Sequence, residues 1–304
     1  MYRIRRSVII KRNLEQKINH FLMGLILIFL LPVFITTFFS KRNVEELISA
    51  YPSVQITEDE AMLPQIVAKQ IGISMPDECI KAQAVVARTN LREAMKLGKS
   101  IPDGISNSML KELWGGEYDT YYARLKSLIA ETAGETLQYN GDYIYAAFHQ
   151  TSAGNTRTMA EYAKKDSMPY LVLASCHEDA MAENYLNVFF WTRDEFLSLM
   201  ENYFPEGKVS STQDVFVLER DEAGYALQVQ VGQTIVDGEL FRNRLSLPSA
   251  CFEITLLEED VRLVTMGCGH GFGMSQYTAQ KMAESGSSYK EILNYFYKGA
   301  VITE

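Results

Sequence analysis

Residues 76–98, with the sequence PDECIKAQAVVARTNLREAMKLG, predict the long helix around which the fold is organised. The stretch opens with Pro76 and two acidic residues, which are favoured in the first turn of a helix. It ends at Gly98, a residue type that commonly follows the last helical turn. Small residues, mainly alanine, fill its middle, so we expect one of its faces to pack closely against neighbouring elements.

Helices are also expected on both sides of this stretch. Thr57-Glu58-Asp59-Glu60 provides an N-cap residue followed by an acidic first turn. The apolar residues that follow share one helical face: Leu63, Ile66, Val67 and Ile71. After a polar stretch at about 99–116, the pattern predicts another helix at about 119–133.

Strand patterns become frequent in the second half of the chain. Asn140-Gly141 separates two strand-like runs within ETLQYNGDYIYAAFHQTS, residues 135–152, which strongly indicates a hairpin. Residues 209–265 indicate mostly strands. Further helices are expected near 192–203, 275–285 and 289–297. Helices and strands do not alternate regularly, so the predicted class is α+β, a mixed helix and antiparallel-strand domain of one or two lobes.

The chain begins with a predicted membrane anchor. Residues 21–39, FLMGLILIFLLPVFITTFF, contain no charged residue and nearly span a hydrocarbon core of about 30 Å. Basic residues gather before this run, which places the N-terminus in the cytoplasm. We therefore expect a cytoplasmic tail over 1–20, an anchor over 21–39, a linker over 40–56 and an extracytoplasmic domain over 57–304. The expected location is the cell membrane, in a single pass.

A cleaved signal peptide is the alternative interpretation of this segment. Such peptides have a shorter apolar region that ends in a small-x-small cleavage site. Here the apolar run ends in Phe38-Phe39-Ser40-Lys41, which is a poor cleavage site. The sequence therefore favours an uncleaved anchor.

Charge and cysteine content exclude some classes of protein. Residues 41–304 contain 23 Lys/Arg and 37 Asp/Glu, an acidic balance that argues against nucleic-acid binding. The chain has 4 cysteines in 304 residues, which excludes a disulfide-dense scaffold. They form no Cys-x-x-Cys motif, and their pairing cannot be deduced from the sequence.

Four segments together resemble the stage II sporulation protein D family, and they occur in the family's order: residues 63–89, 143–171, 238–254 and 267–302. The most specific motifs are KAQAVVART at 81–89 and GHGFGMSQ at 269–276. The resemblance implies a membrane-anchored, outward-facing protein of endospore formation that acts in engulfment. Its substrate would be peptidoglycan glycan strands whose stem peptides a partner amidase has removed, and its partners would include that amidase and other engulfment proteins. The wider family also includes amidase enhancers, and no cofactor is expected.

The resemblance further implies a lytic transglycosylase mechanism with one catalytic glutamate, in a pattern Val-Ala-x-Glu-Met-Pro. That glutamate protonates the leaving oxygen, then accepts a proton from the sugar's 6-hydroxyl, which closes a 1,6-anhydro ring. This chain has Val67-Ala68-Lys69-Gln70, so the catalytic position holds Gln70. An amide does not titrate near neutral pH, and losing general acid–base catalysis costs about 10²–10⁴-fold in rate. The sequence therefore predicts weak or lost catalysis.

Another acid could take over the role of the missing glutamate. Glu78 is the nearest carboxylate within the motif, although it matches a separate acidic position of the family. Its structural alternative is a first-turn helix acid, which stabilises by about 0.3–1 kcal/mol. Two functions therefore remain open: a glycan-cleaving enzyme, and a non-catalytic glycan-binding scaffold or amidase enhancer.

By the same resemblance, eight residues are candidates for binding the glycan: Lys81, Gln83, Arg88, His149, Ser152, His270, Ser275 and Gln276. For those on the 76–98 helix, the alternative is a packed helix with hydrogen-bonded polar tips. Ser275 is also expected to cap the helix that follows it. The glycines of residues 267–273 are expected to allow positive φ and close approach of a sugar.

Other chemistries receive weaker support. His149 and Ser152 could suggest a hydrolase dyad, but no Gly-x-Ser-x-Gly elbow is present. His149, Cys176 and His177 are the weak candidates for a metal site. Their spacing matches no common zinc pattern, so we assign no metal. A metal-dependent hydrolase is thus a remote third class of function.

Overall fold

The computed structural model describes residues 58–163 and 168–304. The predicted tail, anchor and linker lie outside the described residues. Within those ranges, no helix is both long and apolar enough to cross a bilayer. Thr57–Glu304 forms one compact unit of the chain.

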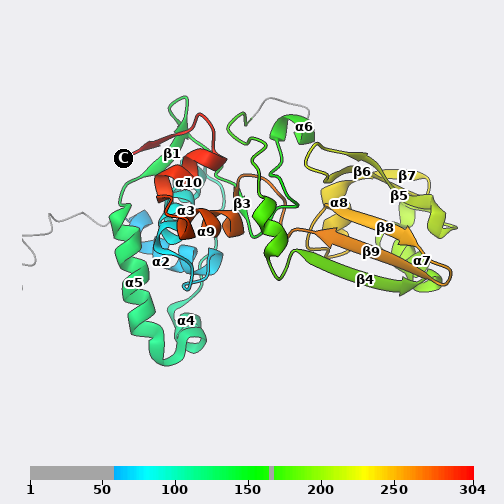
Figure 1. Ribbon diagram of the computed structural model, residues 1–304, viewed down its shortest axis with the longest axis horizontal. Coiled ribbons are helices and arrows are strands. Elements are labelled where there is room, and N and C mark those ends of the chain that lie inside the picture. The colour runs from blue at the N-terminus through cyan, green and yellow to red at the C-terminus, as the bar shows by residue number, and fades with distance from the viewer. Residues whose placement is uncertain (1–57, 164–167) are drawn as a thin grey trace, which may run out of the picture. The chain divides into compact units, whose positions relative to one another are not determined.

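The predicted long helix is confirmed as α3 (Asp77–Leu97), followed by Gly98 in the left-handed conformation at φ 62°. Its small residues are buried, including Ala82, Ala84 and Ala87. The elements that pack around α3 are α2 (Glu58–Gln70), α5 (Tyr118–Glu131), α9 (Gln276–Glu284), α10 (Tyr289–Phe296) and β1 (Thr136–Tyr139) (Figure 1). The buried alanines of α3 let these neighbours approach it closely.

The other predicted helices are confirmed, and the described residues contain three further helices that the sequence did not indicate: α4 (Asn107–Trp114), α6 (Met159–Ala163) and α8 (Gly238–Arg244). In α2 the expected apolar face is buried: Leu63, Ile66, Val67 and the following Ile71. The polar stretch 99–116 contains α4 (Asn107–Trp114), which the sequence did not indicate. Ser106 caps α4 by accepting a hydrogen bond from Met109 N at 3.2 Å. Leu110 is its buried residue, and at 8 residues the helix is too short for its apolar pattern to be distinctive.

The predicted hairpin is confirmed between β1 and β2 (Asp142–Tyr143), which pair in antiparallel register. Asn140 has φ 53° and Gly141 has φ 85°, the two positive values that a tight two-residue turn requires. The last strand, β11 (Val301–Thr303), pairs antiparallel with the other edge of β1. The sheet therefore joins the middle of the chain to its C-terminus.

Two three-stranded antiparallel sheets occupy most of residues 186–266. One has the order β4 (Leu186–Thr192), β9 (Asp260–Met266), β8 (Phe252–Leu256), and the other has the order β5 (Val215–Arg220), β6 (Ala226–Val231), β7 (Thr234–Asp237). They enclose an apolar core with α7 (Arg193–Tyr203) and α8 (Gly238–Arg244). The stacked rings of Phe204, Phe241 and Phe252 lie in this core. A separate core surrounds α3, so the α+β class and the two-lobe alternative both fit the described residues.

A short parallel pair, β3 (Phe148–His149) with β10 (Met274–Ser275), departs from the expected antiparallel pattern. It joins two segments that are far apart in the sequence. The glycines beside it have positive φ as predicted, including Gly269 and Gly273. An added Cβ would collide with His149 at Gly269 and with the Ala147 carbonyl at Gly273. These glycines therefore allow close approach of the protein's own backbone, which corrects the expectation that they make room for a sugar.

Arg157 is a fully buried cation that contacts the glycine-rich stretch and the strand-rich part of the chain. Its guanidinium donates to Asp221 Oδ2 at 2.6 Å and to Glu239 Oε1 at 2.7 Å. It also donates to the His270 carbonyl at 3.2 Å. Three aromatic rings surround it, those of Tyr162, Tyr225 and Phe272. Both carboxylates and the rings offset the free-energy cost of removing this charge from water.

We predict that Arg157→Ala lowers the free energy of unfolding by about 3–5 kcal/mol, because it leaves Asp221 buried without its counter-charge. Urea unfolding followed by circular dichroism measures the change. Arg244→Ala is the control, because Arg244 makes a comparable ion pair with Glu206 at the surface and should change stability far less. Equal losses in the two variants would contradict a special role for the buried network.

Candidate functional site

Gln70 is the last residue of α2, and its side chain lines two adjacent pockets of about 380 Å³ and 340 Å³. The residues shared by the two pockets are Lys69, Gln70, Gln150 and Gln276. We call this pair of pockets the Gln70 groove. Gln70, which the resemblance puts at the position of a glutamate, thus lies in an open site that amide side chains line.

An amide network fixes Gln70. Gln83 Nε2 donates to Gln70 Oε1 at 2.8 Å. Gln276 Nε2 donates to the Gln70 carbonyl at 2.8 Å and to Gln83 Oε1 at 3.1 Å. The Gln70 carbonyl needs such a partner because the last carbonyls of a helix find no N–H donor within the helix. Among the described residues, Gln70 Nε2 has no hydrogen-bond partner, so it is available to a ligand.

His149 and His270 are neutral at physiological pH. The Nδ1–H of His149 donates to the Phe272 carbonyl at 3.0 Å, and its Nε2 accepts from Ser152 Oγ at 2.6 Å. Burial, reinforced by the neighbouring His270, lowers the pKa of His149 to about 3. Burial, with Arg242 and Arg157 nearby, lowers the pKa of His270 to about 4. Of the two, His149 lines the groove, and it adds no positive charge there.

Ser152 and Ser275 are both fully buried behind the groove and share a carboxylate partner, Asp179. The Ser152 N–H donates to Asp179 Oδ2 at 2.5 Å, and Ser275 Oγ donates to the same oxygen at 2.7 Å. Thr278 Oγ1 donates to Oδ1 at 2.6 Å. Burial raises the pKa of Asp179, although these donors act in the opposite direction. Ser275 also caps α9 as predicted, accepting from Thr278 N.

This arrangement does not form a hydrolase triad. Asp179 binds the backbone of Ser152 instead of orienting the His149 imidazole. The Ser152 hydroxyl donates to His149 but is closed off from solvent, so a substrate cannot reach it. The two serines support the wall of the groove and do not line it.

The remaining predicted site residues lie outside the residues that line the groove. Glu78 Oε2 accepts the Tyr289 N–H at 2.6 Å, at the start of α10, and Glu78 also pairs with Lys81. Lys81 makes a second pair with Glu131 at 3.4 Å. Arg88 is fully buried, paired with Glu60, and donates to backbone carbonyls near the end of α5. These three side chains connect helices to one another.

The weak metal candidates do not assemble into a ligand set. In the described parts of the chain, no three His, Cys, Asp or Glu side chains are grouped so that they could hold a metal ion. Burial raises the pKa of the Cys176 thiol to about 11, so it stays protonated, and His177 is exposed. The four cysteines are free thiols.

Several groove residues were not identified from the sequence. Lys69 and Asp103 form an ion pair at 3.2 Å on one side, and Asn184 donates to Gln150 Oε1 at 2.8 Å on the other. Tyr277, for which the sequence left a core position and a sugar platform equally open, also lines the larger pocket. Lys69 precedes Gln70 and Gln150 follows His149, so their positions beside predicted site residues could have identified them. Asp103 and Asn184 come from irregular segments that carry no recognisable pattern.

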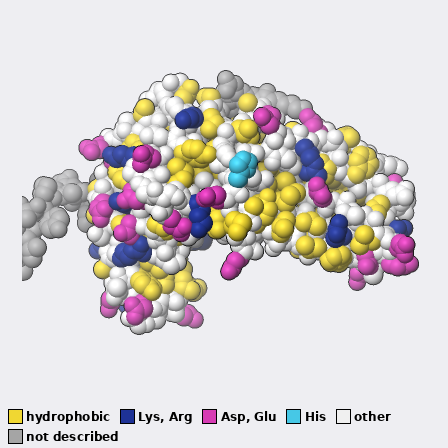
Figure 2. All heavy atoms as spheres, in the orientation of Figure 1, with side chains coloured by type: hydrophobic (Ala, Val, Ile, Leu, Met, Phe, Trp, Pro, Cys, Tyr) yellow, Lys and Arg dark blue, Asp and Glu magenta, His cyan; other side chains and the backbone are white. Residues whose placement is uncertain are grey.

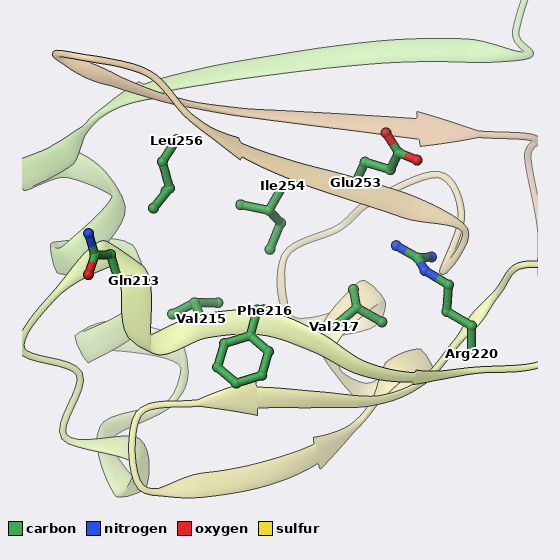
Figure 3. Close-up of a pocket in the computed structure, with 8 residues that line it drawn as sticks. All are labelled: Gln213, Val215, Phe216, Val217, Arg220, Glu253, Ile254 and Leu256. Carbon is green, nitrogen blue, oxygen red and sulfur yellow. The ribbon is translucent and has the colours of Figure 1, made fainter.

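A larger pocket of about 540 Å³ lies between β5 and β8 (Figure 3). Ile254 and Leu256 extend from β8 toward β5, and the lining combines apolar side chains with those of Gln213, Arg220 and Glu253 (Figure 3). The guanidinium of Arg220 is already bound to the carbonyls of Gly224 and Phe252. None of the predicted catalytic or glycan-binding residues lines this pocket, so the Gln70 groove is the better candidate for the glycan.

We predict that the stability of the protein falls as the pH decreases from about 6.5 toward about 4. Both imidazoles have folded pKa values below the ordinary value, so the unfolded chain binds protons first and is favoured in acid. Nuclear magnetic resonance titration of the native and urea-unfolded chain measures the imidazole pKa values. Titration of either His149 or His270 above pH 6 in the native protein would contradict the assignment.

Comparison with known proteins places this chain among sporulation proteins. A family model described as "Stage II sporulation protein" matches residues 49–139. The chain is 30% identical over 272 residues to stage II sporulation protein D of Bacillus subtilis, covering 84% of this chain and 77% of that protein. It is 29% identical over 255 residues to the protein of the same name from Bacillus amyloliquefaciens, covering 79% and 72%. It is also 25% identical over 292 residues to the amidase enhancer of Bacillus subtilis, covering 79% of this chain and 40% of that protein. With this similarity along most of its length, the chain belongs to the stage II sporulation protein D family.

Proposed function

We propose that this protein binds peptide-free glycan strands of peptidoglycan in the Gln70 groove and has weak or no ability to cleave them. The observation that carries the proposal is the position of Gln70: an amide lies in the groove where the family pattern has a glutamate. Lytic transglycosylation needs one group that first donates and then accepts a proton. An amide cannot perform either step near neutral pH.

The other carboxylates near the groove are poorly suited to replace that glutamate. Glu78 is engaged with the Tyr289 N–H and Lys81. Asp179 is enclosed by three donors and has no exposed surface. Asp103 reaches the groove, but its side chain is 84% exposed. Its carboxylate is already paired with Lys69, at 3.2 Å.

Glycan binding does not require the missing acid. Gln70 Nε2, Gln150, Asn184 and Tyr277 supply hydrogen-bonding groups along the groove. Amide and hydroxyl groups of this kind match the hydroxyl and acetamido groups of a glycan. The buried amide network keeps Gln70 in place, so the groove is ordered before a ligand arrives, which lowers the entropy cost of binding.

A scaffold role during engulfment follows from the same proposal. A protein that holds glycan strands without cleaving them could bring a cell-wall amidase to its substrate. The similarity to a relative named amidase enhancer supports this role. We further propose that residues 21–39 anchor the chain in the membrane and that residues 57–304 act outside it, on the basis of the apolar run and its basic flank.

We predict that Gln70→Glu confers transglycosylase activity, with a rise of about 10²-fold or more over the unmodified chain. Gln83 Nε2 would continue to donate to the new carboxylate, which leaves its second oxygen free to face the groove. Full-length protein in mild detergent is incubated with peptide-free glycan strands. Mass spectrometry of 1,6-anhydro ends measures cleavage, and co-sedimentation measures binding.

Two variants control this experiment. Gln70→Ala removes the amide without supplying an acid and should remain inactive. Glu78→Gln should leave binding unchanged if Glu78 only joins helices. Anhydro products from the unmodified chain would refute the inactive-binder proposal, and their loss in Glu78→Gln would then identify the acid. A failure of the unmodified chain to bind the strands would refute the proposal altogether.

A further inference from the structure

Lys69 is the one cationic side chain among the described residues that line the Gln70 groove. It precedes Gln70 in the last turn of α2 and lines both pockets. The groove histidine, His149, is uncharged because burial lowers its pKa to about 3. Residues 41–304 carry an excess of acidic residues, so the sign of this ammonium group is opposite to the net charge of that part of the chain.

The ion pair of Lys69 is of a kind that a ligand can replace. Lys69 Nζ lies 3.2 Å from Asp103 Oδ2, and the two side chains are 48% and 84% exposed. Exposed pairs contribute little to stability, since solvent and salt screen them and the side chains lose entropy in forming them. Asp103 lines the smaller pocket beside Gln70, so the paired carboxylate already marks a place where an anion can lie.

We propose that Lys69 binds a carboxylate on the glycan and thereby selects strands whose stem peptides have been removed. This inference rests on the proposed function. In muramic acid residues the lactyl group is joined to the stem peptide through an amide, which is uncharged. Removal of the peptide leaves a free lactyl carboxylate on the sugar. An ammonium group in the groove therefore distinguishes the stripped sugar from the peptide-bearing sugar by charge.

The contact would replace the Asp103 carboxylate with the carboxylate of the ligand. The ligand contact is the stronger of the two because the sugar covers Lys69 and excludes water, whereas Asp103 leaves it exposed. A charge-assisted hydrogen bond between ammonium and carboxylate also fixes the position of the sugar. Since Lys69 and Gln70 are adjacent, this contact places a muramic acid residue at the family's catalytic position.

Lys96 provides a matched control. Its Nζ lies 2.6 Å from Asp142 Oδ1, and the two side chains are 54% and 77% exposed. This pair resembles the Lys69–Asp103 pair in chemistry and exposure, and neither of its residues lines the groove. Figure 2 shows many such neighbouring Lys/Arg and Asp/Glu side chains on the face in view. Because Lys96→Met removes the same charge as Lys69→Met, a loss of binding seen only in Lys69→Met cannot be attributed to the change in net charge.

The experiment uses the full-length chain in mild detergent and two probes. One probe is peptide-free glycan strands, and the other is the same strands with their carboxylates converted to methylamides. Calorimetry measures binding of each probe by the unmodified chain and by four variants: Lys69→Met, Lys69→Arg, Asp103→Asn and Lys96→Met. Thermal unfolding of each variant verifies that it is folded.

The unmodified chain should bind the carboxylate strands about tenfold more tightly than the methylamide strands. Lys69→Met should abolish that preference, while Lys69→Arg and Lys96→Met retain it. Asp103→Asn should bind the carboxylate strands at least as tightly as the unmodified chain. Equal binding of both probes by the unmodified chain, or an unchanged preference in Lys69→Met, would overturn the inference and leave the proposed function intact. Binding of neither probe would overturn both.

Discussion

The pairing of β3 with β10 is the contact on which the site depends. It is a parallel contact of two residues from each strand, and it joins segments about 125 positions apart in the chain. Its geometry requires glycines at positions where a side chain would strike the opposite backbone. Because β10 leads directly into α9, the pairing places Gln276 where its amide reaches the end of α2. Without it, neither Gln70 nor His149 would have its neighbours.

The site that results is built mostly from neutral groups, together with the ion pair of Lys69 and Asp103. Two histidines are held uncharged by burial, and two serines are turned toward a buried carboxylate. The groove itself presents amides, a tyrosine and Lys69. Such a surface can bind a polar ligand, and at position 70 it presents an amide instead of a titratable group. This difference is the basis for proposing recognition of a glycan without its cleavage.

Much of the fold followed from local patterns. The N-cap and acidic first turn predicted the start of α2, Gly98 predicted the end of α3, and Asn140-Gly141 predicted the hairpin. In each case a few consecutive residues determine the backbone conformation. β4, α4, α6 and α8 were not predicted. β4 alternates exposed and half-buried residues that are apolar on both faces, so its sequence lacks the contrast that marks a half-buried strand.

The sequence by itself determined the class of the fold, the ends of its main helices and the identity of the amide at position 70. Each of these depends on residue identity or short-range spacing. Only the tertiary structure decided which motif residues meet. It joined Gln83 and Gln276 to Gln70, used Lys81, Glu78 and Arg88 to connect helices, and brought Lys69 and Asp103 into one groove. These outcomes depend on contacts between residues far apart in the chain, and no local pattern carries that information.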